Sequence, residues 1–286
     1  MRSGFVTLIG RPNAGKSTLL NKILGTKVSI VSNKPQTTRT RIMGAFTVPD
    51  RDTQIVFVDT PGIHKPVTAL GERLNKTAGS ALNDVDVAVL VLDATAPFGR
   101  GDKFIAEKLP PGFVVVVTKA DRATREQIVA QLQATAQLDA SEWFPVSGKS
   151  GQGVDAFVDH LVANMPEGPR YFPDDMVTDV PEAFHVAELV REQLLRRFGD
   201  ELPYSIATRV TEWDWPRIRC EILVERDSQK GMVIGKGGLI LKEVGIAVRR
   251  QLPEGAFLDL HVGVERDWQR RDEALDRLLD PTYDLG

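Results

Sequence analysis

The stretch GRPNAGKST, residues 10–18, matches the pattern G-x-x-x-x-G-K-[ST] and decides the fold of the first half of the chain. Loops with this pattern bind phosphate between a strand and a helix. Both flanks fit, because the apolar run from Phe5 to Ile9 predicts a strand and the apolar spacing from Ser17 to Leu24 predicts a helix. Consecutive backbone N–H groups and the positive end of the helix surround a polyanion in such loops. The stretch therefore predicts a triphosphate-binding loop, against the alternative of an ordinary glycine turn.

Three side chains supply the chemistry that such a loop needs. Lys16 would neutralise the outer phosphates, and the Ser17 hydroxyl would coordinate a magnesium ion that bridges them. Asp59 ends the apolar run from Ile55 to Val58. That position is the carboxyl edge of a strand, where ligands of open α/β sheets bind. We expect Asp59 to hold the magnesium ion through a water molecule.

Two polar stretches have the features of a nucleotide-dependent switch. In the motif DTPG, residues 59–62, the absence of a side chain leaves the N–H of Gly62 open to a terminal phosphate and the chain able to move. The stretch PQTTRTR, residues 35–41, is a loop able to change conformation. We expect one of its hydroxyls to complete the magnesium shell, from Thr38 rather than Thr37. The predicted switch is Thr37, Thr38 and Gly62, and the predicted catalytic residues are Lys16 and Thr38.

Two further motifs address the base of the nucleotide. TKAD, residues 118–121, follows the apolar run from Phe113 to Val117, so the Asp121 carboxylate can accept hydrogen bonds from N1–H and the exocyclic amine of guanine. Adenine leaves that buried acceptor without a donor, at a cost of about 1 to 3 kcal/mol, so Asp121 favours GTP over ATP. Lys119 would cover the ring with its stem. SGKSG, residues 147–151, offers backbone donors to the guanine carbonyl oxygen, although Ser/Gly loops of this kind are common.

The predicted nucleotide-binding residues are Gly10, Arg11, Pro12, Asn13, Ala14, Gly15, Lys16, Ser17, Thr18, Asp59, Thr60, Pro61, Gly62, Ile63, Thr118, Lys119, Ala120, Asp121, Ser147, Gly148 and Lys149.

Composition describes an ordinary globular chain of 286 residues, 42% apolar and 26% charged, long enough for one large and one smaller domain. The net charge of -3 gives no global basic signal, so any contact with nucleic acid depends on a local patch. The single cysteine, Cys220, excludes an intramolecular disulfide, and its alternation with Ile218 and Ile222 predicts a strand core position. No apolar run approaches the roughly 20 residues that span a bilayer, and no signal peptide is visible, so a cytoplasmic setting is expected.

Strand patterns alternate with helix patterns as far as about Met165, which predicts a mostly parallel, doubly wound sheet with helices on both faces. Prolines and a glycine break both periods in PEGPRYFPDD, residues 166–175, as in a linker. Beyond it come a helix over 182–198, strands over 204–212 and 217–226, a glycine-rich loop, a helix, a strand over 257–264 and a final helix. This order predicts a second domain of the α+β class.

The string VIGKGG, residues 233–238, points to RNA in this second domain, against the alternative of a structural turn. The loop follows an apolar triplet, precedes a helix pattern and is flanked by strands, so its N–H groups and Lys236 can meet a nucleic-acid backbone while the neighbouring apolar groove takes unstacked bases. Arg226, Lys230, Arg249 and Arg250 add local positive charge. The predicted RNA-binding residues are Ile234, Gly235, Lys236, Gly237, Gly238, Ile240 and Lys242.

Over nearly its whole length the chain resembles the Era family of bacterial GTPases, through GRPNAGKS, the TT of PQTTRTR, DTPGI, TKAD, SGK and VIGKGG in that order. The resemblance implies a Ras-like P-loop G domain over 1–167, a linker over 168–180 and a type II KH domain over 181–286. It further implies Mg²⁺ as cofactor, GTP and GDP as substrate and product, and a role in assembly of the small (30S) ribosomal subunit. The implied RNA partner is the single-stranded 3′ end of 16S rRNA, with no DNA partner. Peripheral association with the cytoplasmic face of the inner membrane is also attributed to the family.

Three positions depart from what such GTPases usually carry. Thr118 stands where the family usually has asparagine, which predicts weaker nucleotide affinity with guanine selectivity kept. Gly148 replaces a more usual alanine, and a looser loop is expected. Ile63 stands where Ras has a water-orienting glutamine, so slow intrinsic turnover is expected unless another group or a bound monovalent cation such as K⁺ places the water. Asn13 is the candidate ligand for that cation and is equally suited to cap the loop internally.

The leading hypothesis is a GTPase whose bound nucleotide orders Thr38 and Gly62, and whose hydrolysis releases them and resets the RNA domain through the linker. One alternative is a non-catalytic RNA-binding module that retains the first domain as a scaffold, against which Lys16, Ser17 and Asp59 all argue. Another is a GTPase of RNA modification or membrane transport. That alternative lacks support, since the sequence offers neither a pair of cysteine nucleophiles nor a spanning helix.

Overall fold

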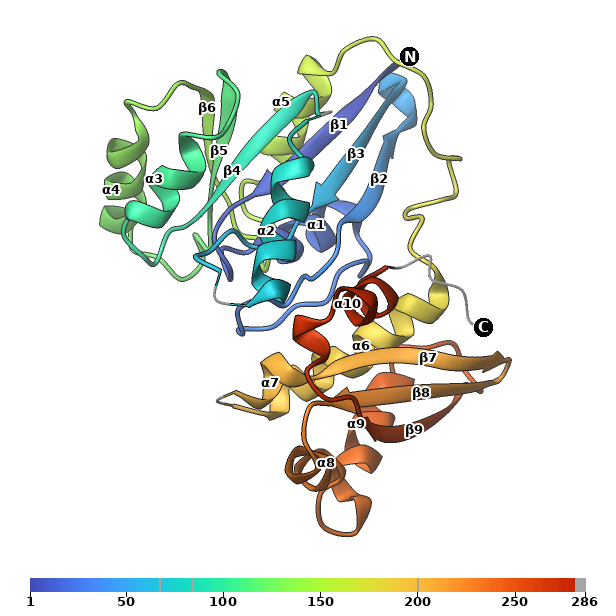
Figure 1. Ribbon diagram of the computed structural model, residues 1–286. Coiled ribbons are helices and arrows are strands. Elements are labelled where there is room, and N and C mark those ends of the chain that lie inside the picture. The colour runs from blue at the N-terminus through green and yellow to red at the C-terminus, as the bar shows by residue number, and fades with distance from the viewer. Residues whose placement is uncertain (67, 84, 200, 281–286) are drawn as a thin grey trace. The chain divides into compact units, whose positions relative to one another are not determined.

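The computed structural model describes residues 1–66, 68–83, 85–199 and 201–280 (Figure 1). The chain folds into two compact units. Unit 1 comprises Met1–Val31, Thr38–Lys65 and Gly71–Asp179, and unit 2 comprises Ser32–Thr37, Pro66–Leu70 and Val180–Gly286. The last part of the predicted KH domain, residues 281–286, lies outside the described residues.

Unit 1 is built on a six-stranded sheet, counted over the described residues, with strand order β2-β3-β1-β4-β5-β6. All neighbouring strands are parallel except β2, which pairs antiparallel with β3 along the outer edge. This is the mostly parallel α/β sheet that the sequence predicts. The strands are β1 (Arg2–Ile9), β2 (Ile42–Val48), β3 (Thr53–Asp59), β4 (Val87–Asp93), β5 (Phe113–Thr118) and β6 (Ala140–Pro145).

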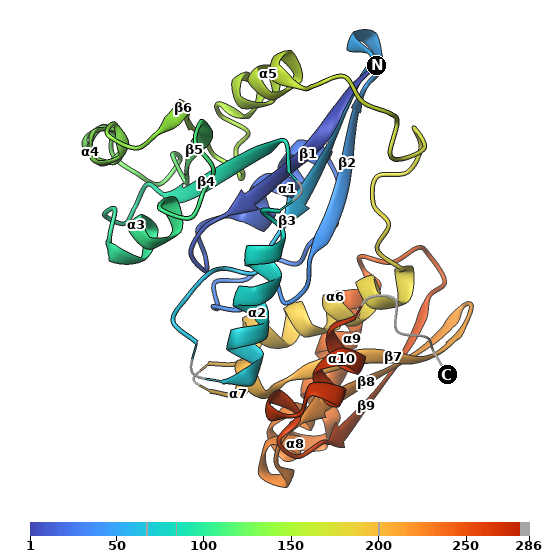
Figure 2. The same cartoon turned by 45° about the horizontal axis from the view of Figure 1, so that its top comes forward.

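Helices cover both faces of this sheet (Figures 1 and 2). A core cluster joins Leu90 and Val115 of the central strands to Ala78 of α2 and Ile105 of α3, with Ile128 of α4 packed against it. The other face is covered by α1, in which Leu19 and Leu20 are fully buried, and by α5. The helices are α1 (Lys16–Leu24), α2 (Ala69–Ser80), α3 (Arg100–Ala106), α4 (Arg125–Thr135) and α5 (Val154–Asn164), with a 3₁₀ turn η1 (Pro49–Arg51).

The proline-rich stretch after α5 lies along the edge of unit 1, and its residues 168–178 are called the strap below. The N–H of Ala45 on β2 donates to the carbonyl oxygen of Val177 at 2.7 Å, and the Thr178 hydroxyl donates to the carbonyl oxygen of Met43 at 2.6 Å. Phe172 is buried against Ala45 and Val56. Most of the predicted linker over 168–180 is therefore packed on the first sheet, and the chain enters α6 (Glu182–Arg197) directly after it.

Unit 2 has a three-stranded sheet of order β7-β8-β9 within the described part of the chain. β7 and β8 form an antiparallel hairpin, and β9 runs parallel to β8. Its core includes Cys220, as predicted, and the fully buried Trp268, whose indole N–H donates to the carbonyl oxygen of Ser205 at 2.9 Å. The elements after α6 are α7 (Leu202–Ser205), β7 (Ala207–Asp214), β8 (Arg217–Val224), α8 (Asp227–Ile234), η2 (Lys236–Gly238), α9 (Leu239–Arg249), β9 (Phe257–Val264), η3 (Trp268–Arg270) and α10 (Asp272–Leu279).

The structure adds elements that the sequence did not predict. These are β2, α2 and α3 in the first half, and the one-turn helix α7 and the helix α8 in the second. The predicted strand over 204–212 begins at Ala207 instead, because Pro203 opens a helical turn that the following residues complete. In the part of the chain that is described, every helix is too short or too polar to cross a membrane.

Candidate active site and nucleic-acid interface

The phosphate loop between β1 and α1 is shaped by close backbone contacts. A Cβ on Gly10 would lie 2.3 Å from the carbonyl oxygen of Val91, so a side chain does not fit there. Gly15 has a φ of 95°, in the region that favours glycine, and Asn13 adopts a φ of 63°. Lys16 folds over the loop and donates from Nζ to the carbonyl oxygens of Gly10 at 3.2 Å and Arg11 at 3.1 Å. The charged end of Lys16 therefore lies inside the curve of the phosphate loop.

Lys16 and Asp59 are both buried beside each other's charge. Lys16 is 5% exposed, and burial lowers its pKa to about 8, although the carboxylate of Asp59 opposes that shift. Burial likewise raises the pKa of Asp59, against the charge of Lys16 and hydrogen bonds from Ser17, Ser29 and Thr38. Two groups whose charged forms are both disfavoured by burial indicate a site prepared for a charged ligand.

Hydroxyl groups converge on one oxygen of Asp59. Ser17 Oγ donates to Asp59 Oδ2 at 2.6 Å and lies 3.0 Å from Thr38 Oγ1, which is itself 3.4 Å from Asp59 Oδ2. Asp59 Oδ1 is buried and has no hydrogen-bond partner among the described residues. Magnesium prefers oxygen ligands, so this set of two hydroxyls and a carboxylate fits the ion. Thr37 instead bonds to Ser32 Oγ at 2.6 Å and to the carbonyl oxygen of Lys34 at 2.7 Å, which supports Thr38 as the metal-side hydroxyl.

The motif at residues 59–63 divides into residues that face the loop and residues that face the core. A Cβ on Gly62 would lie 2.5 Å from the backbone nitrogen of Pro12, so the absence of a side chain permits direct packing on the phosphate loop. Ile63 is buried in the core and its N–H donates to the carbonyl oxygen of Gly10 at 3.2 Å. The Thr60 hydroxyl donates to the carbonyl oxygen of Leu8 at 2.8 Å. The structure therefore gives Thr60 and Ile63 packing contacts, and their contact with nucleotide stays a prediction.

The TKAD residues lie at the end of β5, where each has a defined partner. The Thr118 hydroxyl is within hydrogen-bond distance of the carbonyl oxygens of Ala14 and Leu92, so it still links the strand to the phosphate loop. Lys119 Nζ forms an ion pair with Asp93 at 2.6 Å. Burial alone would raise the pKa of Asp93, but its bonds with Lys119 and Thr95 lower it. In this arrangement Lys119 is held at the end of β4 rather than in solvent.

Asp121 and the loop after β6 lie beside each other. Ser147 Oγ donates to Asp121 Oδ1 at 2.6 Å and thereby fixes the carboxylate. The N–H of Ser147 donates to the carbonyl oxygen of Gln152, which leaves the next residues of the loop as the backbone donors for a base. A Cβ on Gly148 would lie 3.0 Å from the backbone nitrogen of Leu19, so this glycine packs tightly on α1. The looser loop expected from glycine at position 148 stays a prediction beside this packing contact. Lys149 is exposed.

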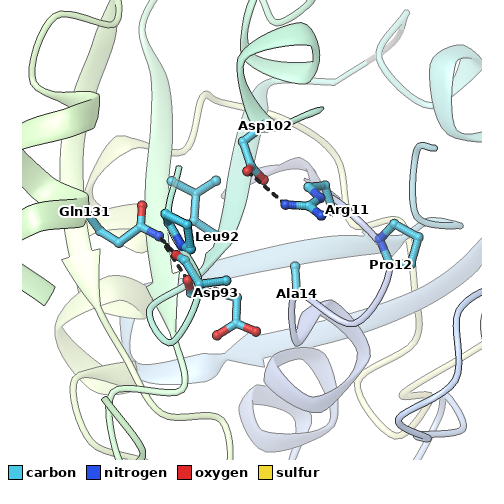
Figure 3. Close-up of a pocket in the computed structure, with 9 residues that line it drawn as sticks. Arg11, Pro12, Ala14, Leu92, Asp93, Asp102 and Gln131 are labelled. Carbon is cyan, nitrogen blue, oxygen red and sulfur yellow. Dashed lines mark hydrogen bonds and ion pairs between the residues drawn. The ribbon is translucent and has the colours of Figure 1, made fainter. Parts of the chain in front are cut away.

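A cavity of about 90 Å³ lies behind the phosphate loop (Figure 3). Arg11 reaches from the loop to Asp102 at the start of α3, with Nη1 3.3 Å from Oδ2. On the other side, Gln131 of α4 donates from Nε2 to the backbone oxygen of Asp93 at 3.0 Å. The phosphate loop is thus linked to α3 through Arg11, and the carboxyl end of β4 is linked to α4 through Gln131.

The glycine loop of unit 2 is open at its centre. Gly237 and Gly238 have φ angles of 61° and 76°, and a Cβ on either would meet nothing within 4 Å. Lys236 beside them is exposed. A Cβ on Gly235, in contrast, would lie 2.6 Å from Cγ1 of Ile240, so this glycine is needed for packing. The predicted residues therefore separate into an accessible backbone at 236–238 and a supporting contact between Gly235 and Ile240, while Ile234 ends α8 and Lys242 is exposed on α9.

Sequence reasoning missed several residues that shape the nucleotide site. Ser29, which donates to Asp59 Oδ2 at 2.8 Å, lies in a loop without a motif. Asp93 and Asp102 lie at the end of β4 and the start of α3, and the position of Asp93 at a strand end could have flagged it.

Comparison with known proteins agrees with this geometry. The family described as "50S ribosome-binding GTPase" matches residues 5–119, and the family described as "KH domain" matches residues 201–269. The proteins called GTPase Era from Mycobacterium bovis (strain BCG / Pasteur 1173P2) and Mycobacterium tuberculosis (strain ATCC 25177 / H37Ra) are each 46% identical over 296 residues, covering 96% of this chain and 98% of the relative.

Two solved structures are similar over almost the whole chain. One is Era in complex with MgGDPNP and nucleotides 1506–1542 of 16S ribosomal RNA, with 36% identity and a TM-score of 0.92. The other is an Aquifex aeolicus Era variant bound to GDP.AlF4-, with 36% identity and a TM-score of 0.91. Each match covers 98% of this chain and 99% of the known one.

Proposed function

Because the chain belongs to the Era family of GTPases, we propose that it is a magnesium-dependent GTP switch that binds the single-stranded 3′ end of 16S rRNA and assists assembly of the 30S subunit. The observation that carries this proposal is the presence of both sites on one chain. A buried phosphate site with a fixed Asp121 lies in unit 1, and an open glycine loop lies in unit 2. The similar Era structure holds a GTP analogue with magnesium and an rRNA segment.

In the proposed reaction the protein acts by positioning and charge. Lys16 and the loop N–H groups would stabilise negative charge on the transferred phosphoryl group. Ser17 and Thr38, with Asp59 through a water, would hold magnesium, which when bound would supply positive charge that offsets the charge of the phosphates. Asp121 would accept the guanine hydrogens, with Ser147 fixing its orientation. No covalent nucleophile is required.

The group that orients the attacking water is a separate part of the proposal. Ile63 is turned into the core and cannot do so, which supports slow intrinsic turnover. A K⁺ ion held near Asn13 is one candidate for orienting the water. The positive φ of Asn13 is compatible with a side chain that hydrogen-bonds within the phosphate loop. A cytoplasmic location, with peripheral contact to the inner membrane, belongs to the same proposal and depends on the family resemblance alone.

The strap gives the proposed switch a route to the RNA domain. The predicted switch stretch over 35–41 leads into β2, the strap bonds to β2, and the strap continues into α6 of unit 2. A change in the stretch when nucleotide is hydrolysed would therefore pull on a segment that is covalently continuous with the RNA domain. We propose this path in place of a free linker.

The substitution Lys16→Ala tests the proposal against the scaffold alternative. GTP turnover is measured by phosphate release, and RNA binding by filter binding. Loss of turnover with RNA binding retained supports an active GTPase site in the first domain. Unchanged phosphate release in the variant contradicts the proposed catalytic site.

RNA crosslinked in cells and sequenced tests the ribosomal partner. Gly237→Asp adds charge to the open loop, whereas Gly237→Asn is the matched neutral control, because both residues tolerate a positive φ. Reads concentrated on 16S rRNA and lost only in Gly237→Asp support the proposal. Reads spread evenly over the transcriptome contradict it.

A further inference from the structure

Ser29 lies in the loop between α1 and the predicted switch, outside every nucleotide motif of the sequence. Its side chain is inside the protein, with the residue 3% exposed. The hydroxyl donates to Asp59 Oδ2 at 2.8 Å. A buried hydroxyl that donates to a buried carboxylate is a strong, charge-assisted contact.

The position of Ser29 is fixed from the helix that carries Lys16 and Ser17. Asn21, one turn further along α1, accepts through Oδ1 from the N–H groups of Val28 and Ser29, both at 3.0 Å. Its Nδ2 donates to the carbonyl oxygen of Ser29 at 2.7 Å. The loop is thus held by three hydrogen bonds from one side chain, and none of them involves the switch stretch over 35–41.

The three hydroxyls around Asp59 differ in what else they must do. Ser17 and Thr38 are the residues that fit as metal ligands, and Thr38 belongs to the stretch that is expected to move. Ser29 does neither. Its bond to Oδ2 leaves Oδ1 as the buried acceptor without a partner among the described residues. A metal-bound water needs such an acceptor, and outer partners that orient a metal's ligands strengthen binding of the metal.

We propose that Ser29 is a positioning residue that fixes Asp59 from the α1 side, so that Oδ1 stays available to the magnesium shell whether or not the switch is ordered. The inference rests on the proposed function, since it concerns the same metal site. It assigns to the α1 loop a part in metal binding that does not depend on nucleotide state.

The test is the magnesium dependence of GDP release, followed with a fluorescent GDP by titrating Mg²⁺ from an EDTA-containing buffer. We expect Ser29→Ala to raise the Mg²⁺ concentration for half-maximal slowing of release by about tenfold, the loss typical of removing an outer partner. Release in EDTA should stay as in the unmodified protein. Thr7→Val is the matched control, because it removes another fully buried hydroxyl of unit 1, one that donates to the carbonyl oxygen of Ala81.

The outcomes separate this inference from the proposed function. The role of Ser29 is overturned if Ser29→Ala and the unmodified protein have the same Mg²⁺ midpoint. It is also overturned if the substitution changes the rate of GDP release in EDTA as much as it does in Mg²⁺. Failure of the unmodified protein to bind GDP overturns the proposed function instead. If Ser29→Ala does not fold, Asn21→Ala keeps the hydroxyl but frees the loop, and it should shift the midpoint in the same direction. An unchanged midpoint in that variant also overturns the proposal.

Discussion

The side-chain amide of Gln54 holds the main chain of Phe172 from both sides. Gln54 Nε2 donates to the carbonyl oxygen of Phe172 at 2.9 Å, and Gln54 Oε1 accepts from the N–H of Phe172 at 3.0 Å. Gln54 is fully buried on β3, and the same Oε1 accepts from the N–H of Tyr171 at 2.9 Å. One side chain of the first sheet therefore fixes the centre of the strap.

Replacing Gln54 should release the strap. Gln54→Ala removes the partner of the buried main-chain groups of Phe172 and of the part-buried N–H of Tyr171, so we expect unfolding of unit 1 to require about 2 to 4 kcal/mol less free energy. Hydrogen exchange should accelerate at residues 171–178, measured by mass spectrometry. Gln133→Ala, on the exposed side of α4, is the control and should leave both quantities unchanged. Unaltered exchange in Gln54→Ala would show that the strap is held by other contacts.

Binding of GDP should take up a proton at about pH 8 and above. The pKa of free Lys16 is lowered to about 8 by burial, and nearby phosphates would raise it again, so above pH 8 the free protein must gain a proton to bind. Affinity for GDP is therefore expected to be highest below pH 8 and to fall as pH rises through this value. Calorimetry in buffers of different ionisation enthalpy measures the uptake. Heats that do not depend on the buffer at about pH 8 would exclude it.

Thr118 should be necessary for nucleotide affinity in spite of its departure from the family pattern. Thr118→Val keeps the shape but removes the hydroxyl that bonds to the carbonyl oxygens of Ala14 and Leu92. We expect GDP affinity to fall about tenfold, since a buried acceptor of the phosphate loop loses its donor. Thr118→Asn offers two N–H groups and should bind at least as tightly as the unmodified protein. Equal affinities of the valine and threonine forms would refute the link.

RNA binding should depend on salt through Lys236. This side chain is exposed beside the open backbone of Gly237 and Gly238. Lys236→Ala should weaken binding to single-stranded RNA and reduce the slope of log affinity against log salt by about 0.7, the value for one phosphate contact. Fluorescence anisotropy at several salt concentrations measures the slope. A parallel loss of affinity with the slope retained would assign Lys236 a role other than phosphate contact.

Cys220 should be inert in the folded protein. It is fully buried in β8, and burial, with the neighbouring charge of Glu221, raises the pKa of its thiol. Because the thiolate is the reactive form, iodoacetamide should modify Cys220 only after denaturation, as measured by intact mass. Labelling of the native protein at the rate of a free thiol would contradict the buried position.

Short-range motifs predicted most of the site, and long-range contacts explain what they missed. Phosphate and base loops follow from residues within a few positions of one another, since strand ends and glycines set their shape locally. Gln54 and Phe172 are 118 positions apart, and nothing in either neighbourhood marks the pair. Ser29 was missed because its role depends on Asn21 and Asp59, which only the fold brings to it. β2 was missed because apolar residues on both faces, with Gly44 among them, leave no regular alternation of apolar and polar positions.

The strap also determines where the first half of this protein can be cut. β2 is the outermost strand of its sheet, and its main chain at Met43 and Ala45 is satisfied by the strap. A fragment ending at residue 167 would expose those main-chain groups together with the apolar side chains that Phe172 covers. Exposed, flat edge strands pair with strands of other chains and form intermolecular sheets. A fragment ending after Asp179 keeps β2 covered by the strap, so it should resist aggregation. The predicted domain limit at residue 167 and this limit differ by the 12 residues 168–179.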